Sequence, residues 1–96
     1  MKKLYLIIHD LRSPGRDYGG LYGAIKGLSG NWRHPMASTW FVSSDADLST
    51  QGIYERLRAF IDDGDNVLVI DMGNPADRRG WMARAFWSWL DGEQEG

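Results

Sequence analysis

Two short apolar runs near opposite ends of the chain constrain its fold more than any other feature. Residues 4–8 read Leu-Tyr-Leu-Ile-Ile and residues 67–70 read Val-Leu-Val-Ile. Both runs are short for helices, and polar and turn-forming residues follow them, so they predict buried strands. Successive side chains of a strand point to opposite faces of a sheet. Each strand therefore presents apolar side chains to both faces, and both faces need cover.

The rest of the chain predicts the remaining elements. Apolar residues at helical spacing predict one helix over residues 18–28 and a second that begins after Ser49 or Thr50. Residues 31–34 and 37–43 predict two strands around a turn near Pro35, and the Trp-rich residues 81–90 predict a short C-terminal helix. We expect one domain over residues 1–91 and a disordered tail over residues 92–96.

The order of these elements is typical of one fold. Strand, helix, strand, strand, helix, strand is the ferredoxin-like βαββαβ pattern, an α+β fold with an antiparallel sheet and two helices on one face. Right-handed crossovers place the first and third strands at the centre of the sheet and the fourth beside the first. The opposite face is then covered either by a second copy in a symmetric homodimer or by the C-terminal Trp-rich segment.

The composition excludes several classes of protein. The 96 residues include no cysteine, which rules out disulfides and thiolate metal sites. No segment approaches the roughly 20 apolar residues that cross a bilayer, and the first apolar run is short for a secretion signal. We expect a cytoplasmic protein without membrane contact. The net charge of −2 argues against a broadly basic surface for nucleic acid but allows a local basic patch.

The chain resembles a group of small bacterial proteins labelled "SinR family", over most of residues 4–90. The matching features are the first strand ending in Asp, the helical stripe, and the segments Trp32-x-His34, Ser38-Thr39-Trp40 and Asp65 before residues 67–70. These proteins look like relatives of the CRISPR-associated Cas-two and VapD ferredoxin-like families. The resemblance implies a sheet-to-sheet dimer. Those families include metal-dependent nucleases, interferase toxins and non-catalytic subunits of a DNA-integration complex.

The resemblance also implies a candidate metal ligand. In the CRISPR-associated family an Asp at the end of the first strand can hold a divalent metal across the dimer axis, and Asp10 occupies that position here. It would bind Mg²⁺ or Mn²⁺, with Arg12 or Arg16 as the basic residue that follows. The alternative is that Asp10 caps the loop after its strand by accepting backbone N–H bonds.

Strand directions bring further polar residues to the same end of the sheet. His9, His34, Ser38 and Asp65 are expected there with Asp10. Asp10 and His34 are the candidate catalytic residues, with His34 as a base. The alternative is that His34, which precedes Pro35, is a turn or packing residue.

Basic residues beside aromatic ones predict a nucleic-acid contact, because cations hold phosphates while aromatic rings stack on bases. The candidates are Arg12, Arg16, Arg33, Arg78 and Arg79. Alternatively, the tryptophans belong to the core and the arginines face solvent.

Two functions remain open from the sequence. The first is a Cas-two/VapD-like homodimer of bacterial defence or mobile elements that contacts RNA or DNA and cleaves phosphodiesters with a divalent metal. The second is a non-catalytic protein–protein interaction module.

Overall fold

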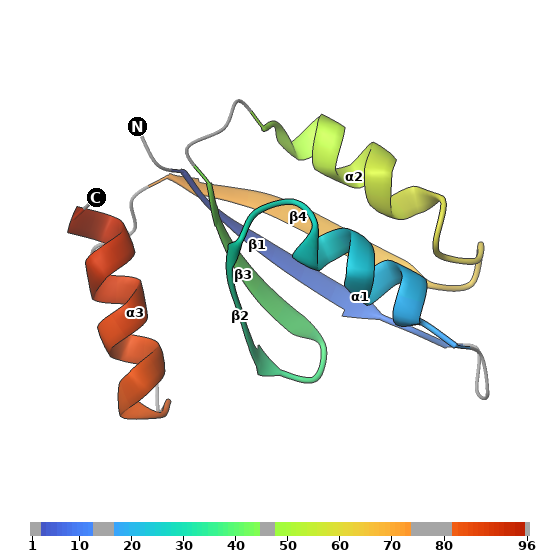
Figure 1. Ribbon diagram of the computed structural model, residues 1–96. Coiled ribbons are helices and arrows are strands. Elements are labelled where there is room, and N and C mark those ends of the chain that lie inside the picture. The colour runs from blue at the N-terminus through green and yellow to red at the C-terminus, as the bar shows by residue number, and fades with distance from the viewer. Residues whose placement is uncertain (1–2, 13–16, 45–47, 74–81, 96) are drawn as a thin grey trace.

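The computed structural model describes residues 3–12, 17–44, 48–73 and 82–95 (Figure 1). These residues form an α+β structure, which confirms the predicted class. The elements are β1 (Lys3–Asp10), α1 (Gly19–Lys26), β2 (Asn31–Met36), β3 (Thr39–Ser44), α2 (Thr50–Arg58), β4 (Asn66–Gly73) and α3 (Arg84–Glu95).

The strands form one antiparallel sheet in the order β2-β3-β1-β4. The two central strands are β3 and β1, and β4 lies beside β1 at one edge. Ile7 of β1 lies opposite Trp40 of β3 on one side and opposite Val69 of β4 on the other. The apolar runs that predicted two buried strands therefore pair directly with each other.

The hairpin of β2 and β3 turns later in the chain than the sequence predicts. β2 continues through His34 and Pro35 to Met36, so the turn lies at Ala37 and Ser38 rather than near Pro35. The register shifts between Arg33 and Met36, where the proline sits. Because β2 is an edge strand, a residue without a backbone N–H is tolerated there.

The larger core lies between the sheet and helices α1 and α2. Ser49 begins α2 as predicted, since its hydroxyl accepts a hydrogen bond of 2.9 Å from the Gly52 backbone N–H. Alternate residues of β1 and β3 meet the two helices in this core, whose fully buried members are Tyr5, Ile7, Leu21, Ile25, Trp40, Val42, Ile53 and Leu57. Phe60, which follows the end of α2, is 38% exposed.

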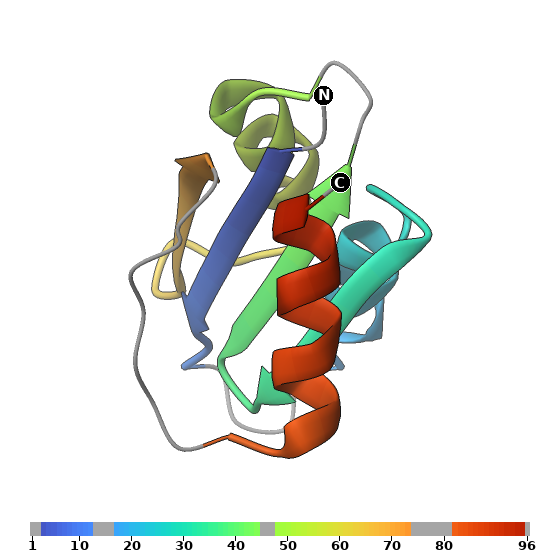
Figure 2. The ribbon, with the colours of Figure 1, turned by 90° about the vertical axis from the view of Figure 1, so that its left-hand side faces the viewer.

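Helix α3 packs against the opposite face of the sheet, as Figure 2 shows. Its apolar residues Phe86, Trp89 and Leu90 form a second, smaller core with Leu4 of β1. The helix extends as far as Glu95, into the stretch 92–96 that we expected as a tail. In the described ranges, no helix combines the length and apolar character that crossing a membrane requires.

Part of that second face lies beyond α3. α3 packs against β2, β3, the start of β1 and, through Met72, the end of β4. Leu68 and Ile70 of β4 are 55% and 37% exposed, and their cross-strand partners Ile8 and Leu6 are half-buried. We call these four side chains the β1–β4 strip.

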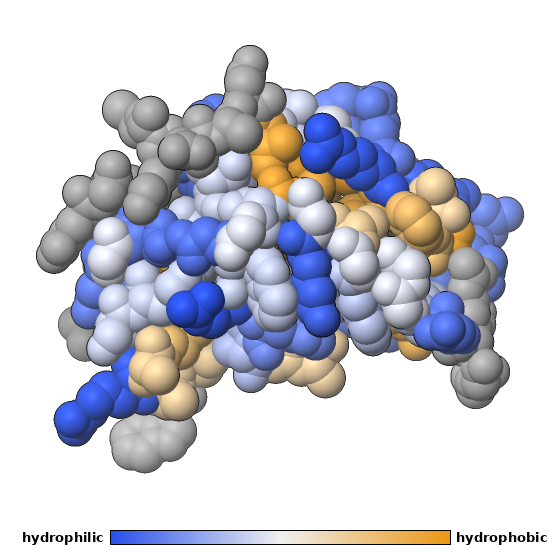
Figure 3. All heavy atoms as spheres, viewed as in Figure 1, coloured by the Kyte–Doolittle hydropathy of each residue, from blue (hydrophilic) through white to orange (hydrophobic). Residues whose placement is uncertain are grey.

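The surface seen in the view of Figure 1 is mixed, with hydrophobic groups between larger hydrophilic areas (Figure 3).

Candidate functional site

Asp10, the predicted metal ligand, ends β1 and forms an ion pair with Arg12. Its Oδ2 atom lies 2.8 Å from Nε and 2.6 Å from a terminal nitrogen of the guanidinium. Both side chains are more than half exposed, and exposed pairs of this kind contribute only about 0–1 kcal/mol. Because solvent screens the two charges, breaking this ion pair costs little free energy. A cation binding Asp10 at Oδ2 would have to displace Arg12.

Asp65 is buried and accepts hydrogen bonds from three segments of the chain. Its carboxylate receives the backbone N–H of Arg12 at 2.8 Å, the hydroxyl of Tyr18 at 2.8 Å and the backbone N–H of Asp62 at 2.9 Å. It therefore joins the end of β1, the start of α1 and the turn before β4. These bonds favour a structural role for the residue.

His9 lies on the other face of β1 from Asp10, in the core below α1. Its ring Nε2 accepts a hydrogen bond of 3.0 Å from the indole N–H of Trp40. Its backbone N–H donates to the carbonyl of Ser38 at 2.9 Å. Burial lowers the pKa of His9 below its usual 6.5, and the nearby charge of His34 lowers it further.

His34 is exposed and stacks on the same indole ring. The centroids of the His34 and Trp40 rings are 3.6 Å apart and the planes differ by 12°. The His34 Nε2 atom lies 3.2 Å from the carbonyl oxygen of Ala37, so it donates its proton there. The ring of Tyr22 from α1 lies 5.7–6.0 Å from His9, His34 and Trp40. Both histidines therefore contact the Trp40 side chain: His9 accepts its indole N–H, and His34 stacks on its ring.

The structure separates the two predicted catalytic residues within one protomer. Strand alternation directs Asp10 away from the α1 side of the sheet, whereas His34 stacks on Trp40 on that side. Among the described residues, no three histidine, aspartate or glutamate side chains are grouped as metal ligands would be. An acid–base pair of Asp10 and His34 is therefore not assembled in a single chain.

Of the predicted nucleic-acid contacts, only Arg12 and Arg33 fall within the described residues; Arg16, Arg78 and Arg79 lie outside them. Arg33 is exposed on β2, and its guanidinium carbon is 5.1 Å from the centroid of the Trp89 ring on α3. Arg33 and His34 also line a cavity of about 210 Å³ between β2 and the start of α3, together with Phe86. This cavity combines the Arg33 cation with an apolar wall.

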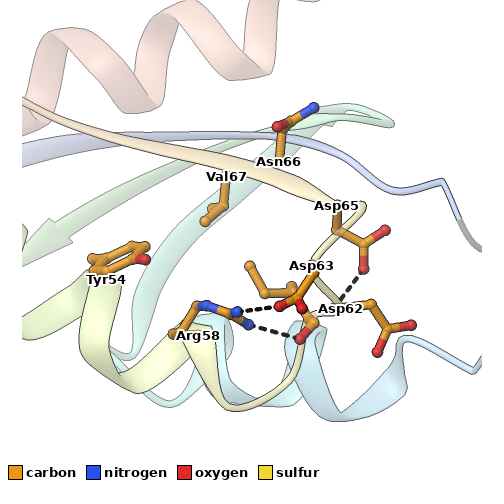
Figure 4. A pocket seen from close by; sticks show the side chains of 8 residues that line it. Tyr54, Arg58, Asp62, Asp63, Asp65, Asn66 and Val67 are labelled. Atoms are coloured by element: carbon orange, nitrogen blue, oxygen red, sulfur yellow. Dashed lines mark hydrogen bonds and ion pairs between the residues drawn. The ribbon is translucent and has the colours of Figure 1, made fainter.

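A second cavity of about 260 Å³ lies between α2 and the start of β4 (Figure 4). Arg58 is turned toward Asp63 at its mouth, and the two form an ion pair of 2.7 Å. Asp62 and Asp65 complete the acidic lining, and Asp65 also accepts the Asp62 N–H. Arg58 holds the carboxylate of Asp63, and the backbone N–H groups of Arg12 and Asp62 donate to that of Asp65.

A polar network that the sequence did not predict lies under α3. Glu93 accepts hydrogen bonds from the Asn31 side-chain amide and, at 2.6 Å, from the Ser43 hydroxyl. Asn31 in turn accepts the indole N–H of Trp89 at 2.6 Å. Glu93 is 62 residues from Asn31, so no local spacing pattern signals the contact. This network fixes α3 over β2 and β3.

No family model, curated protein or solved structure matches this chain.

Proposed function

We propose that this chain is a homodimeric interaction protein of ferredoxin-like topology, and that its dimer forms on the β1–β4 strip. The element order and the sheet order β2-β3-β1-β4 support this topology. The observation that carries the dimer is the exposure of Leu68 and Ile70 beside Leu6 and Ile8. Burying a fully exposed Leu or Ile side chain contributes roughly 1.5–3 kcal/mol. Leu68 and Ile70 are partly covered already, so each would contribute a part of that amount, in both copies of the dimer.

Sedimentation equilibrium over a range of concentrations tests the dimer. Wild-type protein is expected to dimerise, and Leu68→Glu is expected to shift it toward monomer because the carboxylate would be buried. Tyr54→Glu is the matched control, since Tyr54 is 42% exposed but lies on α2, against the other face. A wild-type monomer at every concentration contradicts the proposal, as does an equal effect of both substitutions.

Metal-dependent phosphodiester cleavage, in the manner of the Cas-two and VapD families, is the second candidate. One observation favours it: alternation along β1 puts Asp10 on the same face as Leu6 and Ile8. A dimer on that face would bring Asp10 near its copy in the partner. Two carboxylates, water and a substrate phosphate are a ligand set that suits Mg²⁺ or Mn²⁺.

Cleavage of RNA and DNA with Mg²⁺ or Mn²⁺ tests this second candidate. Activity is expected to disappear in Asp10→Asn and to persist in Glu55→Gln, whose side chain is exposed on α2, against the other face of the sheet. Activity that survives Asp10→Asn excludes the site. A dimer that cleaves neither nucleic acid leaves the non-catalytic interaction module as the function.

Binding without cleavage is measured separately, by gel shift at low salt with single-stranded RNA and DNA. Arg33→Ala is expected to weaken binding, because Arg33 stands exposed beside aromatic rings at the cavity next to α3. Arg56→Ala on α2 is the control. Equal binding by both variants removes β2 from the proposed contact surface.

A further inference from the structure

The two edges of the sheet differ in how well they are protected against pairing with another strand. β2, at one edge, contains Pro35, a register shift and the exposed cation of Arg33. Such features resist the addition of a strand. β4, at the other edge beside β1 (Figure 2), has 8 residues, and its Val-Leu-Val-Ile run contains neither proline nor charge. Among the described residues, no strand lies outside β4. This edge is therefore the one that can accept a further strand.

The hydrogen bonding of β1 shows which backbone groups of β4 point outward. In an antiparallel sheet, the N–H and C=O of one residue point to one neighbouring strand, and those of the next residue point to the other. The N–H of His9 donates on the β3 side, so the groups of Ile8 point to β4, where Leu68 lies opposite and bonds to them. Val67 and Val69, on either side of Leu68, therefore direct their N–H and C=O groups outward. No described residue bonds to these outward groups.

We propose that β4 pairs antiparallel with β4 of a second copy, which joins the two sheets edge to edge about a two-fold axis at Val69. This inference rests on the proposed homodimer and specifies how the two copies meet. The two Val69 residues would face each other and exchange both of their outward hydrogen bonds. Leu68 would lie opposite Ile70 of the second copy, and Ile70 opposite Leu68, on the face that carries the β1–β4 strip.

The apolar side chains of β4 select this register. With the axis at Val69, the exposed Leu68 and Ile70 meet across the axis as non-hydrogen-bonded pairs, in which side chains of opposite strands lie closest. An axis one residue earlier, at Leu68, would place Ile70 opposite the amide of Asn66. Only the axis at Val69 pairs both exposed apolar side chains with each other, so that the strips of the two copies become continuous.

Amide hydrogen exchange of the wild-type protein, read at single residues above and below the midpoint of dimerisation, tests the pairing. The N–H groups of Val67 and Val69 are expected to exchange at least ~10-fold more slowly in the dimer, a factor equivalent to about 1.4 kcal/mol and thus to one hydrogen bond. Trp32 is the internal control. It lies opposite Val42, which bonds to β1, so its N–H points outward from β2. Its exchange should not depend on concentration.

Mixtures of charged variants test the register. Leu68→Lys chains mixed with Ile70→Glu chains are expected to form heterodimers, because the introduced charges face each other while the second Leu–Ile pair is kept. The control mixture is Leu68→Lys with Leu68→Glu, in which each introduced charge faces Ile70 instead. Native mass spectrometry should give a dissociation constant about 2–5-fold lower for the first heterodimer, as a cross-strand ion pair predicts.

The outcomes separate this inference from the proposed dimer. A wild-type dimer whose Val67 and Val69 amides exchange as fast as in the monomer overturns the edge pairing and leaves the dimer itself standing. Wild-type protein that stays monomeric at every concentration overturns both. Equal dissociation constants in the two mixtures overturn the axis at Val69. If a charged variant does not fold, the exchange experiment decides alone, since it needs no substitution.

Discussion

Replacing Asp65 by alanine is expected to cost this protein a large part of its stability. Asp65 is only 7% exposed and accepts hydrogen bonds from the Arg12 and Asp62 backbones and from the Tyr18 hydroxyl. Alanine leaves all three donors without this acceptor, at a part-buried site. The loss falls on three segments at once, since the donors belong to the end of β1, the start of α1 and the turn before β4.

The size of the effect follows from the hydrogen bonds. A hydrogen bond to a charged group contributes about 1.5–3 kcal/mol net, and bonds to one carboxylate are not additive. We expect Asp65→Ala to lower the free energy of unfolding by about 3–5 kcal/mol, against a total of roughly 5–10 kcal/mol for a domain of this size. Asp65→Asn should lose less, about 2 kcal/mol, because one oxygen still accepts.

Urea denaturation followed by tryptophan fluorescence measures these differences. The midpoint is expected to fall with an unchanged slope, because the surface exposed on unfolding is the same. Asp63→Ala is the control, since that carboxylate is 97% exposed and its pair with Arg58 is worth at most about 1 kcal/mol. Tyr18→Phe removes one of the three bonds and should lose about 1 kcal/mol. A loss below about 1 kcal/mol in Asp65→Ala would refute the reasoning.

Three further predictions concern α3, α1 and pH. Glu93→Ala is expected to lower the urea midpoint by an amount equivalent to about 2 kcal/mol, because the buried Ser43 hydroxyl and the half-buried Asn31 amide lose their acceptor; an unchanged midpoint would contradict the network. Gly23→Ala should raise the melting temperature, with about 0.5–1 kcal/mol gained from helix propensity, since a Cβ there meets no atom within 4 Å. Gly20→Ala should not, because its Cβ would lie 2.9 Å from Phe60. The lowered pKa of His9 means that the unfolded chain binds a proton more readily. The His9 contribution to stability is therefore complete above pH 6.5 and is lost as the pH falls through the lower pKa of the folded state. Urea midpoints across this range should fall more in wild type than in His9→Gln.

Much of the fold follows from patterns within short segments. The runs at residues 4–8 and 67–70 predicted the strands that became β1 and β4, and helical spacing predicted α1 and α2. The cap at Ser49 is a bond between residues three apart. The misplaced turn has a different cause: Pro35 usually ends a strand, but β2 lies at the sheet edge and continues through it. Edge position is a property of the whole sheet.

The candidate site was predictable only in part, for the same reason. Asp10 at the end of the first strand and His34 on the hairpin were identifiable from the sequence. The separation of the two onto different faces depends on the register of β1 with β3. Asp65 was expected at the same end of the sheet as Asp10, but neither its hydrogen bonds nor those of Glu93 were predictable, because their donors lie up to 53 and 62 residues away.

By itself, then, the sequence determined which segments become strands and helices, and that both faces of the sheet need cover. It did so because periodicity and capping are interactions between residues a few positions apart. Only the tertiary structure decided how the second face is covered: α3 lies over β2 and β3, and Leu68 and Ile70 remain exposed. The ring of His9 is a second example, because it accepts a hydrogen bond from the Trp40 indole, 31 residues away. Such contacts exist only once the sheet has assembled, because the register of its strands places the two rings side by side.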